Sequence, residues 1–198
     1  MRVTSETKEA TRQAILDATR ELLVERGWER VATRDIAAEA GVGNGTLFNY
    51  FPTKEAIVAE LVAEALRTAA VSATAPKASR GRGTPPGQPA RTPAVQEQVY
   101  ALIAAGLRQL RRYRAFLPFV LGSILTNSER LKNEHLEQIE RIFARALPPM
   151  HRHLYWSLYS GVLTFWVSDD SPKQVETLAF IDHSVALFCA SLSKEGGS

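Results

Sequence analysis

Apolar residues recur at the spacing of an α-helix along nearly the whole chain, and this pattern limits the fold more than any other feature. The first segment with this spacing contains Ile15, Leu16, Thr19, Leu22 and Leu23. Positions i, i+1, i+4, i+7 and i+8 share one helix face, and no segment shows the strict alternation typical of a half-buried strand. We therefore predict an all-α protein with about nine helices.

One segment interrupts the helical pattern and divides the chain. Residues 71–94 contain five of the ten prolines, three glycines and no large apolar residue except Val71. Such a composition predicts a disordered linker between an N-terminal domain, residues 8–68, and a C-terminal domain, residues 95–194. The sequence RGRG at 80–83 allows a minor-groove contact, although a solvated linker is the simpler interpretation.

Turn and capping residues predict where individual helices begin and end. In the N-terminal domain, Gly27 and Gly41 end helices, Pro52 stops a third, and Thr33 and Thr53 are N-caps. The C-terminal helices are predicted from Val95 to Leu110, from Pro118, over 128–147 after a capping box at Thr126–Glu129, over 150–168, and over 173–193 after Ser171 as N-cap and Pro172.

Charge and composition exclude several classes of protein. The net charge is +3, but residues 1–70 carry 9 basic and 11 acidic residues, so a DNA-binding surface there must be a local cluster. The single Cys189 allows no intrachain disulfide and fits a buried apolar position. The longest nearly apolar run, residues 115–125, is shorter than the ~18 residues of a membrane span. We expect a cytoplasmic protein without membrane contact.

Residues 33–50 have the organisation of a helix-turn-helix: a helix over 33–40, a turn over 41–43 and a helix over 44–50. In such a unit the second helix enters the major groove of DNA. Gly45 would let that helix approach closely, while Leu47 and Phe51 hold it on its neighbours. The short polar side chains available to bases or phosphates are Asn44, Thr46 and Asn49.

Residues 11–62 closely resemble the N-terminal domain of the tetracycline-repressor (TetR) family of bacterial regulators. The resemblance rests on an apolar-faced first helix ending in Gly27 before Trp28, and on the sequences TRDIAAEAGV, GTLFNYF and PTKEAI. The ending FWVSDDSPKQVETLAFIDHSVALF is similar to the last two helices of many members. The rest of the chain matches the family only in layout.

The resemblance implies a set of DNA-binding residues: Thr33, Arg34, Asn44, Gly45, Thr46, Asn49, Tyr50 and Lys54. Among these, Lys54 would contact a phosphate. Three positions depart from the family pattern: Gly43 replaces a capping serine, Phe48 a common tyrosine, and Asn49 a frequent histidine. Phe48 by itself fits a core aromatic, and Thr33 could be only a helix cap.

The resemblance also implies that residues 95–193 bind an effector and form a homodimer. Trp156 and Tyr159, one turn apart, are the preferred ligand-binding residues, followed by Phe116, Phe119 and Phe143, although each aromatic singly fits an ordinary core. The predicted dimer contacts form one apolar row on the last helix: Leu178, Ile181, Val185 and Phe188.

No pattern indicates an enzyme, a metal site or a cofactor. His151 and His153 diverge on a helix, and no nucleophile–base signature is present. The resulting hypothesis is a homodimeric repressor that a small, largely apolar effector releases from a double-stranded DNA operator. The alternative is an architectural DNA-binding protein without an effector, which a cavity in the C-terminal bundle would argue against.

Overall fold

The computed structural model describes residues 5–74, 94–127 and 129–195. Within these ranges the protein is all-α and contains no strand, as predicted. The helices are α1 (Ser5–Arg26), α2 (Thr33–Glu39), α3 (Asn44–Tyr50), α4 (Lys54–Thr74), α5 (Val95–Leu110), α6 (Leu117–Asn127), α7 (Glu129–Phe143), α8 (Pro149–Ser168) and α9 (Val175–Glu195), with short 3₁₀ turns at Arg111–Tyr113 and Pro172–Gln174.

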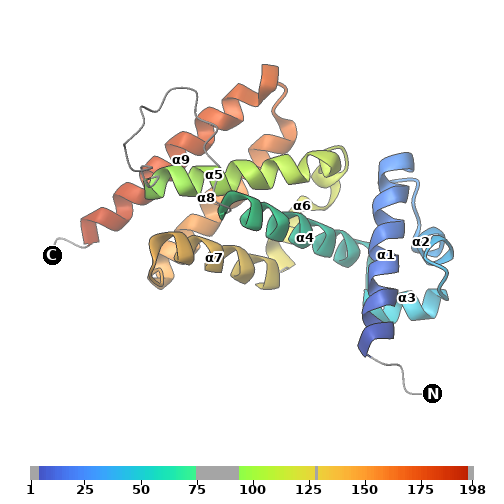
Figure 1. Cartoon of the computed structure of the whole chain (residues 1–198). Coiled ribbons are helices and arrows are strands. Elements are labelled where there is room, and N and C mark those ends of the chain that lie inside the picture. The colour runs from blue at the N-terminus through green and yellow to red at the C-terminus, as the bar shows by residue number, and fades with distance from the viewer. Residues whose placement is uncertain (1–4, 75–93, 128, 196–198) are drawn as a thin grey trace, which may run out of the picture.

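The helices form two groups that α4 connects. Figure 1 shows α1, α2 and α3 together at one end of the molecule, and α4 running from them into a bundle with α5 to α9. α4 packs against α1 in the first group and most extensively against α5 in the second. Its residues Ile57, Val58 and Leu61 are fully buried. The burial of apolar surface along α4 therefore stabilises both groups at once.

Most of the predicted boundaries in the N-terminal domain are confirmed. Gly27 and Gly41 end α1 and α2 in the left-handed region, with φ of 78° and 66°. The Thr53 hydroxyl accepts a hydrogen bond from the backbone N–H of Ala56 at 3.1 Å and so caps α4. Thr33, however, is the first residue of α2 rather than its cap. The cap is Ala32, whose N–H donates to the Asp35 carboxylate at 2.9 Å.

Three predicted boundaries in the rest of the chain are wrong. α4 continues to Thr74, into the range predicted as linker; residues 75–93 lie outside the described residues. Thr126 belongs to α6 and donates its hydroxyl proton to the Gly122 carbonyl instead of capping α7. α7 ends at Phe143 rather than 147, because Ala144 adopts a left-handed conformation with a φ of 52°. The Glu140 carboxylate accepts the Leu147 N–H at 3.0 Å and holds the following segment against the helix.

The last helix begins at Val175, after the 3₁₀ turn, and buries one face in the bundle. By length and composition alone, Pro172–Ser193 is apolar enough to cross a membrane. In the structure, however, Ile181, Val185 and Phe188 are buried among the other helices. The buried share of this apolar segment is 33%, so the helix packs one face on the bundle and exposes much of the rest.

Candidate functional site

The α2–turn–α3 unit is held in place by a few local contacts and a small core. Gly41 adopts a φ of 66°, which residues with a side chain rarely adopt, and the Val42 N–H donates to the Ala37 carbonyl at 2.9 Å. Ile36 of α2 and Leu47 of α3 are fully buried. Gly43 is the N-cap of α3 and supplies no side-chain hydrogen bond. Packing, rather than capping, therefore fixes the orientation of α3.

The outward face of α3 carries most of the predicted DNA-binding residues. Asn44, Gly45, Thr46 and Asn49 are exposed, whereas Tyr50 is half-buried against the core. A Cβ added at Gly45 would meet no described atom within 4 Å, and its φ is not in the left-handed region. The fold of the protomer thus does not require glycine at this position, although a close approach to DNA would.

Phe48 also lies on this outward face, and its interpretation as a core aromatic is wrong. Its side chain is 44% exposed, while Leu47 and Phe51, four residues apart, take the buried positions. The spacing itself contained the signal, because residue 48 is rotated about 100° from Leu47 on a helix. We therefore add Phe48 to the candidate DNA-facing surface, where a ring can make apolar contact with a thymine methyl group.

α2 contributes one charged side chain beside this face. The Arg34 side chain is 83% exposed and approaches the Asp35 carboxylate no closer than 3.7 Å. Thr33, the first residue of the helix, is half-buried. Arg34 therefore extends into solvent with its charge available to a phosphate.

Lys54, predicted to contact a phosphate, is engaged within the protein. Its ammonium group donates to the backbone carbonyls of Trp28 at 2.8 Å and Val31 at 2.9 Å, and lies 3.7 Å from the centre of the Trp28 ring. Partial burial lowers the pKa of this ammonium group. These contacts tie the start of α4 to the loop between α1 and α2, so the geometry gives Lys54 a structural role. The phosphate contact stays a prediction.

Replacing Lys54 with methionine separates the two roles. We expect Lys54→Met to lower the free energy of unfolding by about 1–3 kcal/mol, because two hydrogen bonds from a charged group are lost. If Lys54 also contacts a phosphate, as the resemblance implies, the slope of log affinity for DNA against log salt concentration should fall by about one unit per half-site, whereas a purely structural Lys54 leaves the slope unchanged. Arg34→Met is the matched comparison: it should leave stability unchanged and reduce the slope by about one unit per half-site. If Lys54→Met lost a full unit of the salt slope at unchanged stability, Lys54 would be a phosphate contact without a structural role.

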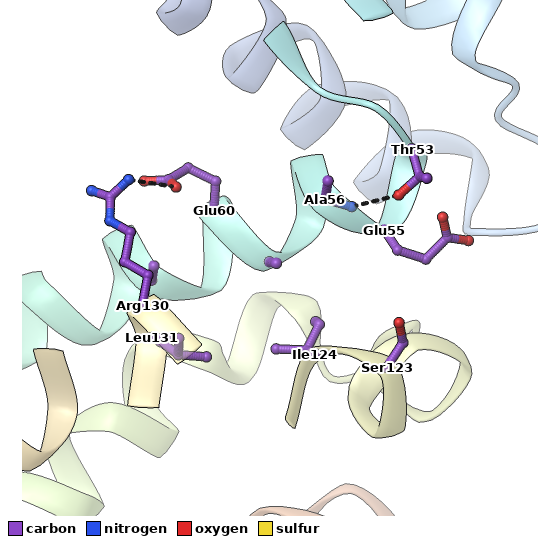
Figure 2. A pocket seen from close by; sticks show the side chains of 10 residues that line it. Thr53, Glu55, Ala56, Glu60, Ser123, Ile124, Arg130 and Leu131 are labelled. Atoms are coloured by element: carbon purple, nitrogen blue, oxygen red, sulfur yellow. Dashed lines mark hydrogen bonds and ion pairs between the residues drawn. The ribbon is translucent and has the colours of Figure 1, made fainter. Parts of the chain in front are cut away.

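A cleft of about 430 Å³ lies between α4 on one side and α6 and α7 on the other. We call it the domain cleft. Figure 2 shows Ser123 and Ile124 of α6 opposite the first turns of α4, with Arg130 and Leu131 of α7 beside them. Its apolar lining consists of Ala56, Ala59, Ala63, Ile124 and Leu131. The volume falls within the range of small-molecule sites.

An ionic network at the edge of the domain cleft links the two groups of helices. Glu60 of α4 pairs with Arg12 of α1 at 2.9 Å and, as drawn in Figure 2, with Arg130 of α7 at 3.5 Å. It also pairs with Arg67, which reaches Glu134 of α7 at 2.9 Å. Burial alone would raise the pKa of Glu134, but hydrogen bonds from the two arginines lower it. Glu60 therefore connects α7 to α1 through one carboxylate.

The five aromatic residues predicted to line one ligand pocket do not come together. Trp156 and Tyr159 are neighbours, with ring centres 5.8 Å apart. Phe143 lies further along the same region, against Phe188. Phe119 is wrong as a pocket residue in the protomer, because its side chain is 58% exposed on α6. Phe116 is buried, and its ring contacts that of Tyr113, whose centre lies 5.6 Å away, rather than that of Trp156 or Tyr159.

Two residues that the sequence did not single out complete the region around Tyr159. The His135 ring of α7 stacks on Tyr159 with centres 4.0 Å apart, and its Nε2 is hydrogen-bonded to the Tyr155 hydroxyl at 3.0 Å. We call His135, Tyr155 and Tyr159 the aromatic stack. Complete burial lowers the pKa of His135 to about 3, so the imidazole is neutral at physiological pH. The spacing of Leu131, His135 and Ile139 on the apolar face of α7 was the available signal.

The apolar row predicted to contact a partner subunit faces the wrong way. Ile181, Val185 and Phe188 are buried inside the protomer, because α9 packs this face on α5 and α8; Leu178 is exposed. Seven large apolar residues of α8 and α9 are exposed, and four of them lie within the helices away from their first turns: Leu154 and Phe165 of α8, and Phe180 and Leu187 of α9. Phe165 and Phe180 contact each other edge to face at 5.3 Å. We call these four residues the α8–α9 outer face.

The described ranges contain no group of three or more His, Cys, Asp or Glu side chains able to hold a metal ion. Cys189 is a free, half-buried thiol whose pKa is raised by burial.

Comparison with known proteins finds matches to family models in both the N-terminal and the C-terminal part of the chain. The family model "Bacterial regulatory proteins, tetR family" matches residues 15–61, and "Tetracyclin repressor-like, C-terminal domain" matches residues 122–196. The HTH-type transcriptional repressor KstR2 of Rhodococcus jostii is 38% identical over 55 residues, which cover 28% of this chain and 27% of that protein. The matched segment spans less than a third of the curated relatives' length.

Solved structures share the whole architecture. A TetR transcriptional regulator from Rhodococcus sp. RHA1 has a TM-score of 0.70 at 18% identity, covering 91% of this chain and 96% of that one. FadR of Thermus thermophilus, a TetR-family transcriptional repressor in complex with lauroyl-CoA, has a TM-score of 0.65 at 18% identity, covering 90% and 93%. At such identities the likeness shows the fold alone.

Proposed function

Because the chain belongs to the TetR family of bacterial transcriptional regulators, we propose that it is a homodimeric, cytoplasmic repressor that a small, largely apolar effector releases from its operator. The observation that carries this proposal is the outward face of α3, where Asn44, Thr46 and Asn49 are exposed around Gly45 on a helix packed only by its opposite side. An exposed, polar, glycine-containing helix face of this kind fits the major groove.

Asn49 is the residue we propose to read a base directly. Its side-chain amide can pair with the major-groove edge of adenine, and such a pair discriminates by about 1–3 kcal/mol. We expect Asn49→Ala to relax the preference at one base pair per half-site and to leave the salt slope nearly unchanged. Selection of bound sequences from a randomised duplex library, at two salt concentrations, measures both. An equal loss of affinity for every sequence would demote Asn49 to a backbone contact.

The α8–α9 outer face supports the proposed homodimer. Exposed Leu154, Phe165, Phe180 and Leu187 offer an apolar surface that a second copy of the chain can cover. Figure 1 shows α9 at the edge of the bundle away from α1 to α3, with α8 crossing behind α5. A dimer through this surface leaves both α3 helices free, and two-fold symmetry would set them roughly 34–36 Å, or a multiple of it, apart.

The domain cleft and the ionic network favour a regulator controlled by an effector rather than an architectural DNA-binding protein. A ligand that favours one position of α7 relative to α4 changes the operator affinity through its differential affinity for the two arrangements. Glu60 supplies the connection, since it pairs with Arg12 of the DNA-binding domain and Arg130 of α7. The complex of FadR with lauroyl-CoA shows a ligand bound within the same fold. The test measures binding of the protein to a library-selected operator fragment in the presence of cell extracts and small molecules. If none of them lowers the operator affinity, the architectural alternative is favoured.

A further inference from the structure

The Tyr159 hydroxyl is buried without a hydrogen-bond partner. Its residue is 1% exposed, and no group in the described parts of the chain hydrogen-bonds to this oxygen. The hydroxyl lies against α5, since a Cβ added at Gly106 would be 3.7 Å from it. An unsatisfied buried hydroxyl destabilises the free protein. By contrast, the Tyr155 hydroxyl, one turn away, is hydrogen-bonded to His135.

The groups around this hydroxyl carry no net charge. His135 is neutral, and burial raises the pKa of both tyrosines. Arg67 and Glu134 line a space that His135 also lines, and they pair with each other at 2.9 Å. A ligand group that reaches Tyr159 therefore finds a donor for one hydrogen bond but no free counter-ion. Burying a charged group there would be strongly unfavourable.

The domain cleft and the surroundings of the Tyr159 hydroxyl are connected by lining residues that neighbouring spaces share. Ala63 and Leu131 line both the cleft and a space of about 10 Å³ that His135 and Leu66 also line. A Cβ at Gly106 would lie 3.0 Å from Leu66 as well as near the Tyr159 hydroxyl. Tyr155, Tyr159 and Phe188 line a third space of about 10 Å³. Leu66 and His135 therefore link the wall of the small space to the surroundings of Tyr159.

We propose that the effector is an uncharged, mainly apolar molecule with a hydrogen-bond-accepting oxygen, which enters through the domain cleft and binds the Tyr159 hydroxyl. This inference rests on the proposed function, because it names the class of effector for that regulator. The oxygen satisfies the hydroxyl, and the apolar body occupies the space between α4 and α7. The ligand thus touches the helix that carries the DNA-binding domain.

The first test needs no ligand and uses the two tyrosines as a matched pair. Tyr159→Phe removes an unsatisfied hydroxyl, so the melting temperature should rise, by about 2–4 °C. Tyr155→Phe removes the partner of His135, so the melting temperature should fall by at least as much. A fall in Tyr159→Phe equal to that in Tyr155→Phe would show that the Tyr159 hydroxyl has a partner in the free protein and would overturn the inference.

The second test uses three probes with one carbon skeleton: propylbenzene, the ketone propiophenone and the anion 3-phenylpropanoate. Calorimetric titration of the full chain should give about fivefold tighter binding of propiophenone than of propylbenzene, the gain of one hydrogen bond. Tyr159→Phe should abolish that difference. Propiophenone binding that is unchanged in Tyr159→Phe, or tighter binding of the anion than of the ketone, would contradict the proposal.

Operator binding distinguishes failure of this inference from failure of the proposed function. Without a probe, the wild-type chain and Tyr159→Phe should bind a library-selected duplex equally well. Propiophenone should release the wild type from this duplex at a concentration about fivefold lower than the one needed to release Tyr159→Phe. If both bind DNA but the ketone results fail, the effector class is wrong and the regulator remains. If the wild type selects no DNA sequence, the proposed function itself falls.

Discussion

Gly45→Leu should abolish operator binding while making the protein slightly more stable. A side chain at this position meets no described atom of the protomer, so it can only project from the outward face of α3. There it would stand between the helix and the major groove and prevent the approach on which the neighbouring polar groups depend. Glycine is a poor helix former, so leucine should raise the free energy of unfolding by about 0.5–1 kcal/mol. We expect operator affinity to fall at least about 100-fold, the sum of several lost contacts.

Gly122→Leu provides the control. Gly122 is an exposed glycine of α6, and a Cβ there also meets no described atom within 4 Å. It should show the same kind of stability gain without any effect on DNA binding. Thermal unfolding and fluorescence anisotropy with a library-selected duplex measure both quantities. Wild-type affinity in Gly45→Leu would mean that this face of α3 does not meet DNA.

Leu187→Asp should convert the proposed dimer into a folded monomer that has lost most of its operator affinity. Leu187 is 67% exposed in the protomer, so aspartate there costs the isolated chain little. In a dimer through the α8–α9 outer face, two carboxylates would be placed in an apolar contact. Because binding of the second half-site then gains nothing from the first, we expect a loss of at least about 100-fold in affinity. Sedimentation equilibrium at micromolar concentration reports the oligomeric state.

Phe119→Asp is the matched control, because Phe119 is a large apolar residue of α6 with a 58% exposed side chain. It should leave the dimer and the operator affinity unchanged. Dissociation by Phe119→Asp, with an intact dimer in Leu187→Asp, would move the interface from α8 and α9 to the α6 side of the bundle.

The sequence predicted the elements that depend on local patterns. Helical periodicity gave the all-α fold, and Gly27, Gly41 and Thr53 marked boundaries because a left-handed turn or a capping hydroxyl acts within a few residues. The exposed positions of Asn44 and Asn49 followed from the same periodicity, once Leu47 was assigned to the core.

What the sequence could not predict depends on contacts between distant segments. The Lys54 ammonium group donates hydrogen bonds to carbonyls 26 and 23 residues earlier in the chain. These contacts cannot be predicted from the local motif, in which a lysine is expected to be a free cation. The last helix is apolar around much of its circumference, and only its packing on α5 and α8 decides that Ile181 is buried and Leu187 exposed. His135 joins Tyr155 and Tyr159 across two helices, at a sequence separation that no local pattern spans.

The uninterrupted course of α4 has a mechanical consequence. Its 21 residues contain neither glycine nor proline, the residues at which helices usually kink, so we expect it to move as one rigid rod. At 1.5 Å per residue the rod is about 31 Å long, and a tilt of about 5° at one end displaces the other by about 3 Å. That displacement is as large as a whole hydrogen bond between an amide and a base. An effector that increases the distance between α4 and α7 only slightly would therefore displace α3 from its position in the major groove of the DNA.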